Sequence, residues 1–307
     1  MAIEPSTTPL MTHFEPETLA LLRGLALKAR YVVEGYLSGL HQSPFHGAST
    51  EFKEYREYYP GDDLRYLDWR VYARSDRLCV KLYTAETNTH VYMICDSSGS
   101  MAYRGERAWG SKFECSCILA AALSWLTLRQ NDSVGLLSLR EDDSAPKFLR
   151  PSQKAKQFGL IVRQLERLQP TGQAQLSTLL SLAAQFVHRR SIIVLLSDLM
   201  EPSEAIEESL SELRLRGHDC LIFQVLDRDE LEFPFDKAAV FEDLETGARR
   251  RVSPRAAREK YLQRFESFMS GHRGMFESME IPHYVVRTDD DPWQILAKFL
   301  TERERLK

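Results

Sequence analysis

Short apolar runs alternate with longer amphipathic segments from His90 to the C-terminus. The runs are apolar at consecutive positions, which is typical of strands that are covered on both faces. They predict strands at His90–Cys95, Asp132–Leu139, Ser191–Ser197, Asp219–Leu226 and His283–Arg287. The other segments predict helices at Lys112–Arg129, Gln153–Leu168, Gln175–His188, Ser203–Arg216, Arg255–His272 and Pro292–Arg303. This order predicts a Rossmann-like α/β fold, in which helices cover both faces of a mostly parallel sheet.

The part of the chain before His90 has a different pattern. Leucines near helical spacing from Leu19 predict a short helix that ends near Arg30, and a strand is predicted at Leu78–Tyr83. The stretch from Ser38 to Gly61 is punctuated by Gly and Pro and predicts loops. We therefore divide the chain into an N-terminal extension over residues 1–86 and an α/β domain over residues 87–307.

Two of the predicted strands are followed by an aspartate, Asp96 and Asp198. Ligands of open parallel sheets bind at the carboxyl ends of the strands, so the two carboxylates share one crevice if their strands are neighbours. Ser98 and Ser100 alternate with Asp96, which lets one loop aim a carboxylate and two hydroxyls at one point. Such hard oxygen donors suit Mg²⁺ or Mn²⁺ rather than Zn²⁺. We predict a metal site formed by Asp96, Ser98 and Ser100, with Asp198 acting through water.

Two other interpretations of these residues stay open. Ser and Asp before a helix often accept hydrogen bonds from its free N–H groups, so Asp96, Ser98, Ser100 and Asp198 could be helix caps. Alternatively, Asp96 is the nucleophile of a magnesium-dependent phosphotransferase, although that chemistry normally needs a second Asp where Ser98 stands. A nucleotide-binding loop is not predicted at Gly105–Lys112, because the final pair of that motif is reversed.

Several stretches of the chain resemble known families. The motif Asp96-x-Ser98-x-Ser100 after an apolar strand is similar to the metal-ion-dependent adhesion site of von Willebrand factor A domains. The segments from Ser43 to Phe52, from Arg56 to Arg74 and from Phe241 to Gly247 resemble the bacterial domain-of-unknown-function family fifty-eight. This resemblance covers nearly the whole chain, from Ser38 to Leu300, and implies a von Willebrand factor A-like fold. It also implies a non-catalytic interaction module that partners a MoxR-type AAA+ ATPase and protein clients in remodelling or maturation.

One departure from the von Willebrand pattern concerns the metal. Those domains usually supply a third hydroxyl from a Thr in a Gly-Gly-Thr-Asp-Leu-like loop, and the matching loop here is Gly172-Gln173-Ala174-Gln175-Leu176. We expect Ala174 to weaken the binding of Mg²⁺ or Mn²⁺, because it removes one ligand. A structural adaptor that works without metal is therefore an alternative function.

The segment from Arg56 to Arg74 interleaves opposite charges with aromatic side chains. Arginine and carboxylate at this density predict an ion-pair network that holds an irregular loop in shape. A partner-docking surface is the alternative, because Tyr, Trp and Arg also dominate interface hot spots. The residues in question are Arg56, Asp62, Asp63, Arg65, Asp68, Trp69, Arg70 and Arg74.

Composition narrows the class of partner. The formal net charge of −4 and the two short basic runs give no sign of a nucleic-acid-binding face. The N-terminal residues lack the pattern of a secretory signal, and the apolar runs are too short for a membrane span. The five cysteines are odd in number and mostly lie in apolar runs, which predicts reduced, buried thiols. We expect a cytoplasmic protein that does not bind nucleic acid and has no membrane span.

Overall fold

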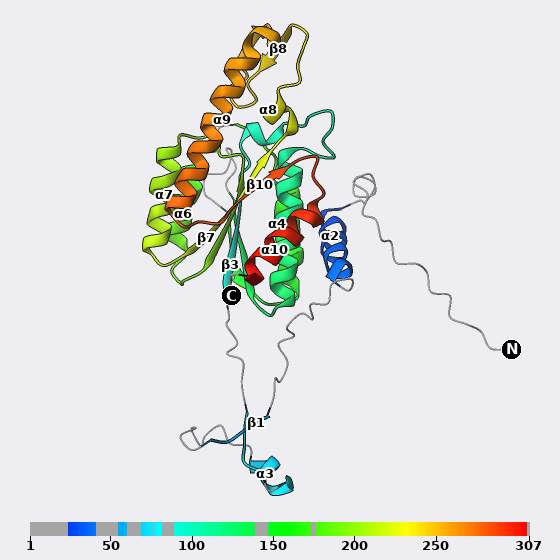
Figure 1. Cartoon of the computed structure of the whole chain (residues 1–307), viewed down its shortest axis with the longest axis vertical. Helices are drawn as coiled ribbons and strands as arrows, with labels where there is room; N and C mark the ends of the chain where they lie inside the picture. Colours follow the sequence, from blue (N-terminus) through cyan, green and yellow to red (C-terminus); the bar gives the residue numbers. More distant parts are fainter. Residues whose placement is uncertain are drawn as a thin grey trace, which may run out of the picture. The chain divides into compact units, whose positions relative to one another are not determined.

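The structure is a computed structural model that describes residues 24–40, 55–59, 69–75, 77–81, 89–138, 147–172 and 176–305. The chain forms two compact units (Figure 1). The larger unit contains residues 1–42 and 89–307, and the smaller unit contains residues 43–88.

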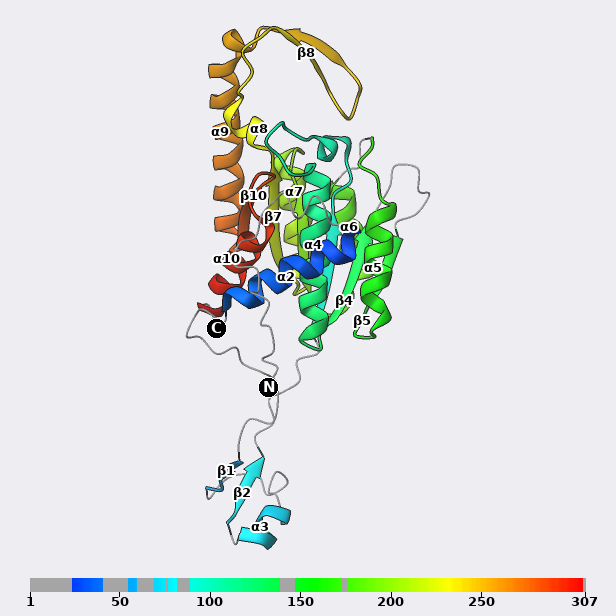
Figure 2. The ribbon, with the colours of Figure 1, turned by 90° about the vertical axis from the view of Figure 1, so that its right-hand side faces the viewer.

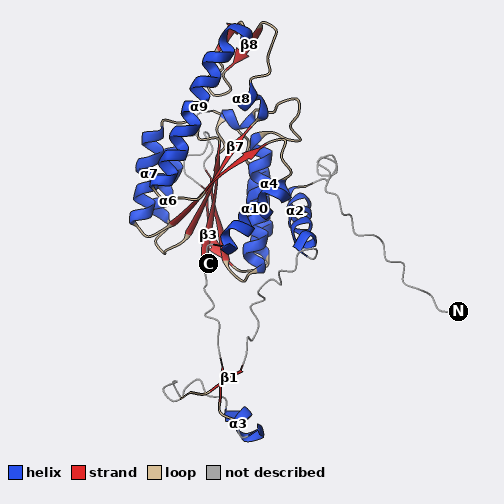
Figure 3. Cartoon of the chain, in the orientation of Figure 1, coloured by secondary structure: helices blue, strands red, loops and turns tan. Residues whose placement is uncertain are grey.

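A six-stranded sheet is the centre of the larger unit (Figure 3). Its strands are β3 (His90–Cys95), β4 (Ser133–Ser138), β5 (Lys147–Ser152), β6 (Ile192–Ser197), β7 (Asp219–Leu226) and β10 (His283–Arg287). They lie side by side in the order β10-β7-β6-β3-β4-β5, and every pairing is parallel except that of β5 with β4. Counted along the chain, this is the 3-2-1-4-5-6 order of a doubly wound fold. The predicted mostly parallel α/β sheet is confirmed.

Helices cover both faces of this sheet. One face carries α4 (Lys112–Arg129), α5 (Lys156–Arg167) and α10 (Pro292–Arg305), and the other carries α6 (Leu176–Phe186), α7 (Ser203–Leu215) and α9 (Pro254–Ser278) (Figure 1). Each face has its own apolar core, and neighbouring strand residues point into different cores. Met93 belongs to the first core and Ile94 to the second, and both are fully buried. This explains why the strand sequences are apolar at consecutive positions.

The N-terminal helix is longer than predicted. Helix α2 spans Leu25–Leu40, so it continues ten residues past the predicted end at Arg30. Leu25, Ala29, Val32 and Val33 recur at helical spacing and are buried in the core that contains α4. The helix that we assigned to the N-terminal extension therefore packs on the larger unit.

The edge strand β5 was not predicted. It pairs antiparallel with β4, and its residues are only half-buried or exposed. Its sequence, KFLRPS, contains Pro151 and alternates weakly, as expected for an edge that is covered on one face at most. Apolar periodicity finds buried strands, so it missed this one.

Shorter elements complete the description. The short helix η2 (Gly99–Ala102) follows β3, and helix α8 (Arg228–Glu232) follows β7. Strands β8 (Ala239–Glu242) and β9 (Arg249–Val252) form an antiparallel hairpin. In the smaller unit, β1 (Tyr55–Glu57) pairs antiparallel with β2 (Cys79–Lys81), and α3 spans Trp69–Ser75.

Four cysteines of the described residues are free and buried: Cys95, Cys115, Cys117 and Cys220. Burial raises the pKa of the Cys95 and Cys220 thiols to about 12, so these are unreactive core residues. Among the described helices, none combines the length and the apolar content that crossing a membrane requires.

Two histidines lie in an aromatic cluster between α9 and β10. The ring of His272 is fully buried and packs edge-on against Phe268, with ring centroids 4.3 Å apart. His283 contacts Phe276 and bonds through Nε2 to Oε1 of Gln224 at 2.9 Å. Burial lowers the pKa of His272, and burial with the charge of His272 lowers the pKa of His283 to about 4.

These histidines predict a pH dependence of stability. Their pKa values in the folded chain lie below the ordinary value of 6.5, so between about 6.5 and 4 the unfolded chain binds more protons. The free energy of unfolding should therefore fall as pH is lowered through this window. His272→Leu should make that fall shallower, whereas replacing an exposed histidine, His188→Leu, should not. Urea unfolding at several pH values measures the slope; equal slopes for wild type and His272→Leu would contradict the expectation.

Candidate functional site

The pairing of β3 with β6 brings the two predicted aspartates together. The strands are parallel neighbours, with Cys95 opposite Leu196. The backbone N–H of Asp96 donates to the carbonyl of Leu196 at 2.9 Å, so the two strands end at the same level. Asp96 and Asp198 follow at the carboxyl edge of the sheet, where the two residues are 3% and 1% exposed. The two strands are neighbours, as the prediction of a shared crevice requires.

The loop after β3 is folded around Asp96. One oxygen of its carboxylate, Oδ1, accepts the backbone N–H of Ser98 at 2.8 Å, and Oδ2 accepts the hydroxyl of Ser197 at 2.6 Å. The hydroxyl oxygens of Ser98 and Ser100 lie 3.0 Å apart. Neighbouring ligands of an octahedral Mg²⁺ ion are also about 3.0 Å apart, because each lies about 2.1 Å from the metal at a right angle. The two hydroxyls form a hydrogen bond with each other, and the same spacing also fits two ligands of one ion.

The loop that should supply a third ligand lies beside this motif. The N–H of Gly99 donates to the carbonyl of Gly172 at 2.8 Å, and the N–H of Thr171 donates to the carbonyl of Ser97 at 3.1 Å. Ala174 lies outside the described residues. The described part of this loop thus lies beside the motif. The effect of Ala174 on metal binding stays a prediction.

The helix-cap interpretation does not match the local geometry. Ser98 precedes η2, but its side chain makes no capping hydrogen bond to that helix. Pro202, not Asp198, precedes α7, and Asp198 instead accepts the N–H of Met200 at 3.2 Å. Ser98 and Asp198 therefore do not cap η2 and α7.

Two buried carboxylates at one edge disfavour each other's charge. Burial and, to a smaller extent, the charge of Asp198 raise the pKa of Asp96 to about 7. Hydrogen bonds from Ser197 and Ser98 oppose this rise only in part. A cation at this edge would relieve the repulsion.

Lys112 is a residue of the site that the sequence did not reveal. Its Nζ lies 2.8 Å from Oδ2 of Asp198 and 2.6 Å from Oε1 of Glu230, and its side chain is 1% exposed. Burial alone would lower the pKa of Lys112, but Asp198 and Glu230 together raise it above its ordinary value. Glu230 is held in turn by the capping box of α8, where it accepts the N–H of Asp227 at 2.7 Å.

A weak sequence signal for this role does exist. Lys112 is the first residue of α4, and a cation there opposes the positive end of the helix dipole. Its charge therefore needs carboxylate partners from elsewhere in the chain. In the sequence, Lys112 stands out only through the reversed final pair of the nucleotide-binding motif.

The donor set fits a hard divalent cation. Asp96, Asp198, Glu230 and Glu245 bring four carboxyl groups to this region, and the ammonium of Lys112 lies among them. Within the described residues, no cluster of three or more His, Cys, Asp or Glu has the arrangement of a metal site. A metal here would therefore bind through the Ser98 and Ser100 hydroxyls with water, as proposed for Mg²⁺ or Mn²⁺.

The charged and aromatic block predicted between Arg56 and Arg74 belongs to the smaller unit. Trp69 is 62% exposed and meets Tyr72 edge-on, and Arg74 is exposed. The side chains that would form the ion pairs lie outside the described residues: Arg56, Asp62, Asp63, Arg65, Asp68 and Arg70. The network and the docking surface both stay predictions, although the exposure of Trp69 in this unit suits docking.

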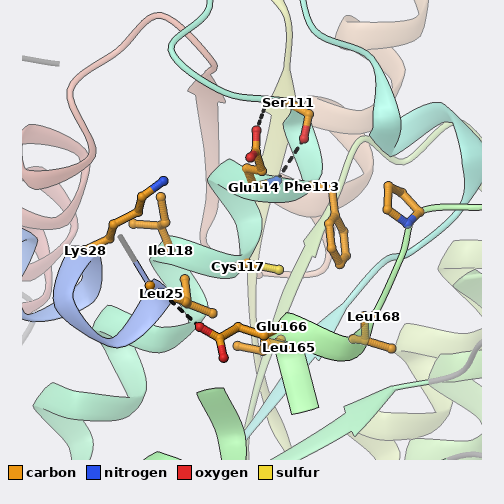
Figure 4. A pocket seen from close by; sticks show the side chains of 12 residues that line it. Leu25, Lys28, Ser111, Phe113, Glu114, Cys117, Ile118, Leu165, Glu166 and Leu168 are labelled. Atoms are coloured by element: carbon orange, nitrogen blue, oxygen red, sulfur yellow. Dashed lines mark hydrogen bonds between the residues drawn. The ribbon is translucent and has the colours of Figure 1, made fainter. Parts of the chain in front are cut away.

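A cavity of about 350 Å³ is separate from this site (Figure 4). It is lined by side chains from α2, α4 and α5, and Glu166 accepts the N–H of Leu25 at 3.1 Å at its edge. Ser111 and Glu114 cap α4 there through reciprocal hydrogen bonds. None of its described lining residues belongs to the candidate metal site.

The fold and the site together define a class of protein. A doubly wound sheet with an Asp-x-Ser-x-Ser loop at the carboxyl end of its first strand is a von Willebrand factor A-like domain. More particularly, the chain belongs to the family described as "Protein of unknown function DUF58", which matches residues 54–269.

Known proteins similar to this chain do not define its activity. An uncharacterised protein of Mycobacterium tuberculosis is 26% identical over 296 residues, covering 95% of this chain and 91% of that protein. Among solved structures, the conserved hypothetical protein BatB of Bacteroides thetaiotaomicron is 14% identical with a TM-score of 0.41, covering 71% of this chain and 99% of that one. The VWA domain of SpRpn10 is 10% identical with a TM-score of 0.41, covering 68% of this chain and 94% of that domain. These scores are low, so the fold class rests on the sheet order and the motif.

The buried ion pair of Lys112 gives a stability prediction. Lys112→Met should lower the free energy of unfolding by about 3–5 kcal/mol, because Asp198 would stay buried without its partner. Arg216→Met breaks an exposed pair with Glu212 and should cost less than about 0.5 kcal/mol. The double variant Lys112→Met/Asp198→Asn should recover much of the loss. Urea unfolding in EDTA measures all three; a cost for Lys112→Met no larger than for Arg216→Met would contradict the role of Lys112.

Proposed function

We propose that this protein is a non-catalytic, cytoplasmic interaction module that binds a partner through a divalent cation. The observation that carries the proposal is the pair of hydroxyls on Ser98 and Ser100, 3.0 Å apart beside two buried carboxylates. Mg²⁺ or Mn²⁺ would be held by these hydroxyls, with Asp96 and Asp198 balancing its charge. The remaining positions would be filled by water and by an Asp or Glu of the partner.

The surroundings of Asp96 support binding rather than catalysis. Both of its oxygens already accept hydrogen bonds, from Ser98 and Ser197, which hold the carboxylate in place. A phosphotransferase would use Asp96 as its nucleophile and normally a second Asp two residues later, where Ser98 stands. Turnover of a generic phosphatase substrate that needs Mg²⁺ and is lost in Asp96→Asn would overturn the non-catalytic assignment.

The proposed partner is a MoxR-type AAA+ ATPase, which would remodel or mature client proteins. This choice follows from the resemblance of the chain to its family and to von Willebrand factor A domains. The carboxyl edge of the sheet supports it, because Ser100 is only half-buried beside the fully buried aspartates. A carboxylate from another protein could approach from this side.

A metal-independent adaptor is the second candidate, and Lys112 favours it. Its ammonium lies 2.8 Å from Asp198 and supplies a positive charge inside the chain. If that charge suffices, the edge of the sheet is stable without a metal. The two candidates differ in one measurable property, the affinity for Mg²⁺ or Mn²⁺.

Calorimetric titration of the EDTA-treated protein with Mn²⁺ tests the metal site. We expect saturable binding to one site in the wild type and no measurable binding in Ser98→Ala/Ser100→Ala. Ala174→Thr should restore the third hydroxyl and tighten binding on the order of tenfold, which corresponds to about 1.4 kcal/mol. Ser124→Ala is the matched control, because its hydroxyl is buried and bonds only to the carbonyl of Ala120 in its own helix.

The outcomes separate the two candidates. Equal heats in the wild type and in Ser98→Ala/Ser100→Ala would exclude the metal site and leave the adaptor. Binding that is lost in the double serine variant and kept in Ser124→Ala supports the adhesion site.

A pull-down tests the partner. The immobilised protein should retain a purified MoxR-type ATPase in the presence of Mg²⁺. It should release most of the ATPase when EDTA is added. Ser98→Ala/Ser100→Ala should behave in Mg²⁺ like the wild type in EDTA, while Ser124→Ala should retain the ATPase. Retention that is the same under all these conditions would point to metal-independent docking instead.

A further inference from the structure

The β8–β9 hairpin has a turn that is closed by hydrogen bonds. The carboxylate of Asp243 accepts the N–H groups of Glu245 and Thr246 at 2.9 and 3.1 Å, and the N–H of Gly247 donates to the carbonyl of Asp243 at 2.8 Å. Gly247 has a φ of +69°, which favours glycine at this point of the turn. The turn therefore presents Glu245 in a defined position.

Contacts between aromatic rings hold the base of this hairpin near α9. Phe241 of β8 stacks on Phe233, with ring centroids 5.9 Å apart, and meets Phe235 edge-on at 5.3 Å. Phe233 in turn packs on Tyr261 of α9 at 4.5 Å. Figure 2 shows the result: the hairpin leaves the top of α9 and reaches back over the carboxyl edge of the sheet.

The tip of the hairpin touches the motif loop itself. A Cβ atom placed on Gly99 would lie 2.3 Å from the carbonyl oxygen of Leu244 and 3.2 Å from Cα of Glu245. The backbones thus approach more closely than any side chain at position 99 would permit. The motif contains glycine at this position, and the contact gives a physical reason for it.

Glu245 lies beside the site. It is half-buried, whereas the flanking residues Leu244 and Thr246 are exposed. Its Cα lies 3.2 Å from the position of a Cβ on Gly99, so its side chain begins beside the loop that carries Ser98 and Ser100. A carboxylate beside a ligand hydroxyl is where a partner's Asp or Glu would bind in the function proposed above.

We propose that Glu245 is an internal ligand of the metal site and that the β8–β9 hairpin is a displaceable latch over the docking face. This inference rests on the proposed metal-dependent function. The latch is anchored at two places, the aromatic base around Phe233 and the tip at Gly99. The strands between these anchors have four residues each and are largely exposed, so the tip can lift while the base stays packed.

The latch has two consequences for binding. Glu245 strengthens the hold on the metal, because it adds an anionic oxygen ligand to two neutral hydroxyls. It also competes with a partner's carboxylate, because both need the same position on the ion. Only molecules with an open latch can bind the partner. The apparent affinity for the partner is therefore proportional to the fraction of molecules in which the latch is open.

Two measurements on the full-length protein test the latch. The first is Mn²⁺ affinity, from the free-ion signal in electron paramagnetic resonance. Glu245→Gln should weaken binding about tenfold or more, and Glu245→Asp, which retracts the carboxylate by one methylene, should fall between. Glu242→Gln is the matched control on the same hairpin, where an exposed pair with Arg249 is lost, and it should bind Mn²⁺ like the wild type.

The second measurement is trypsin cleavage at Arg249, Arg250 and Arg251, which are exposed on β9. Saturating Mn²⁺ should slow cleavage severalfold in the wild type and in Glu242→Gln, because the metal fixes the tip through Glu245. In Glu245→Gln, the metal should have little effect on the cleavage rate. The first measurement reports on the ion and the second on the hairpin, and neither needs a partner protein.

The outcomes distinguish this inference from the function on which it rests. If the wild type does not bind Mn²⁺, the proposed function and the latch both fail. If the wild type binds Mn²⁺ and Glu245→Gln binds it equally well with equal metal protection of the hairpin, the adhesion site stands and the latch is wrong. Should Glu245→Gln be unfolded by circular dichroism, the same comparison between Glu245→Asp and the wild type decides.

Discussion

The parallel pairing of β3 with β6 is the constraint on which the rest of the site depends. It ends two buried strands at one level and so places Asp96 and Asp198 together where water is largely excluded. Two such charges cost several kcal/mol each unless the surrounding structure compensates them. The nearby elements can be understood as that compensation: Ser197 donates to Asp96, and the ammonium of Lys112 contacts Asp198.

A third buried aspartate lies at the carboxyl edge, after β7. Asp227 follows this strand and is buried, and it accepts the N–H of Gly105 at 2.9 Å and the hydroxyl of Thr288 at 2.7 Å. It also begins the capping box of α8 that positions Glu230 against Lys112. The short helix α8 therefore links the third acidic strand end to the first two. An acidic edge of this kind is costly for stability and is useful where a cation or a cationic group is to be bound.

The proposed latch gives a role to the part of the domain that interrupts the regular fold. The β8–β9 hairpin lies between β7 and α9, outside the six-stranded sheet. Its exposed strands contribute little to either apolar core, yet its tip makes the backbone contact at Gly99. An element that adds little to stability and covers a candidate site is suited to a regulatory role, because lifting it costs the fold little.

Local pattern determined the secondary structure of the buried domain and the chemistry of its motif. The strands at His90–Cys95 and Asp219–Leu226 and the helix at Lys112–Arg129 were predicted to the residue, since runs apolar on both faces and helical periodicity are properties of short segments. Lys112 and Glu245 were different, because the residues they contact lie 86 and 146 positions away along the chain, at Asp198 and Gly99. Only the tertiary structure decided that a lysine neutralises one aspartate and that a hairpin carries a carboxylate onto the motif. Charge compensation and backbone approach depend on distance in space, which local pattern does not encode.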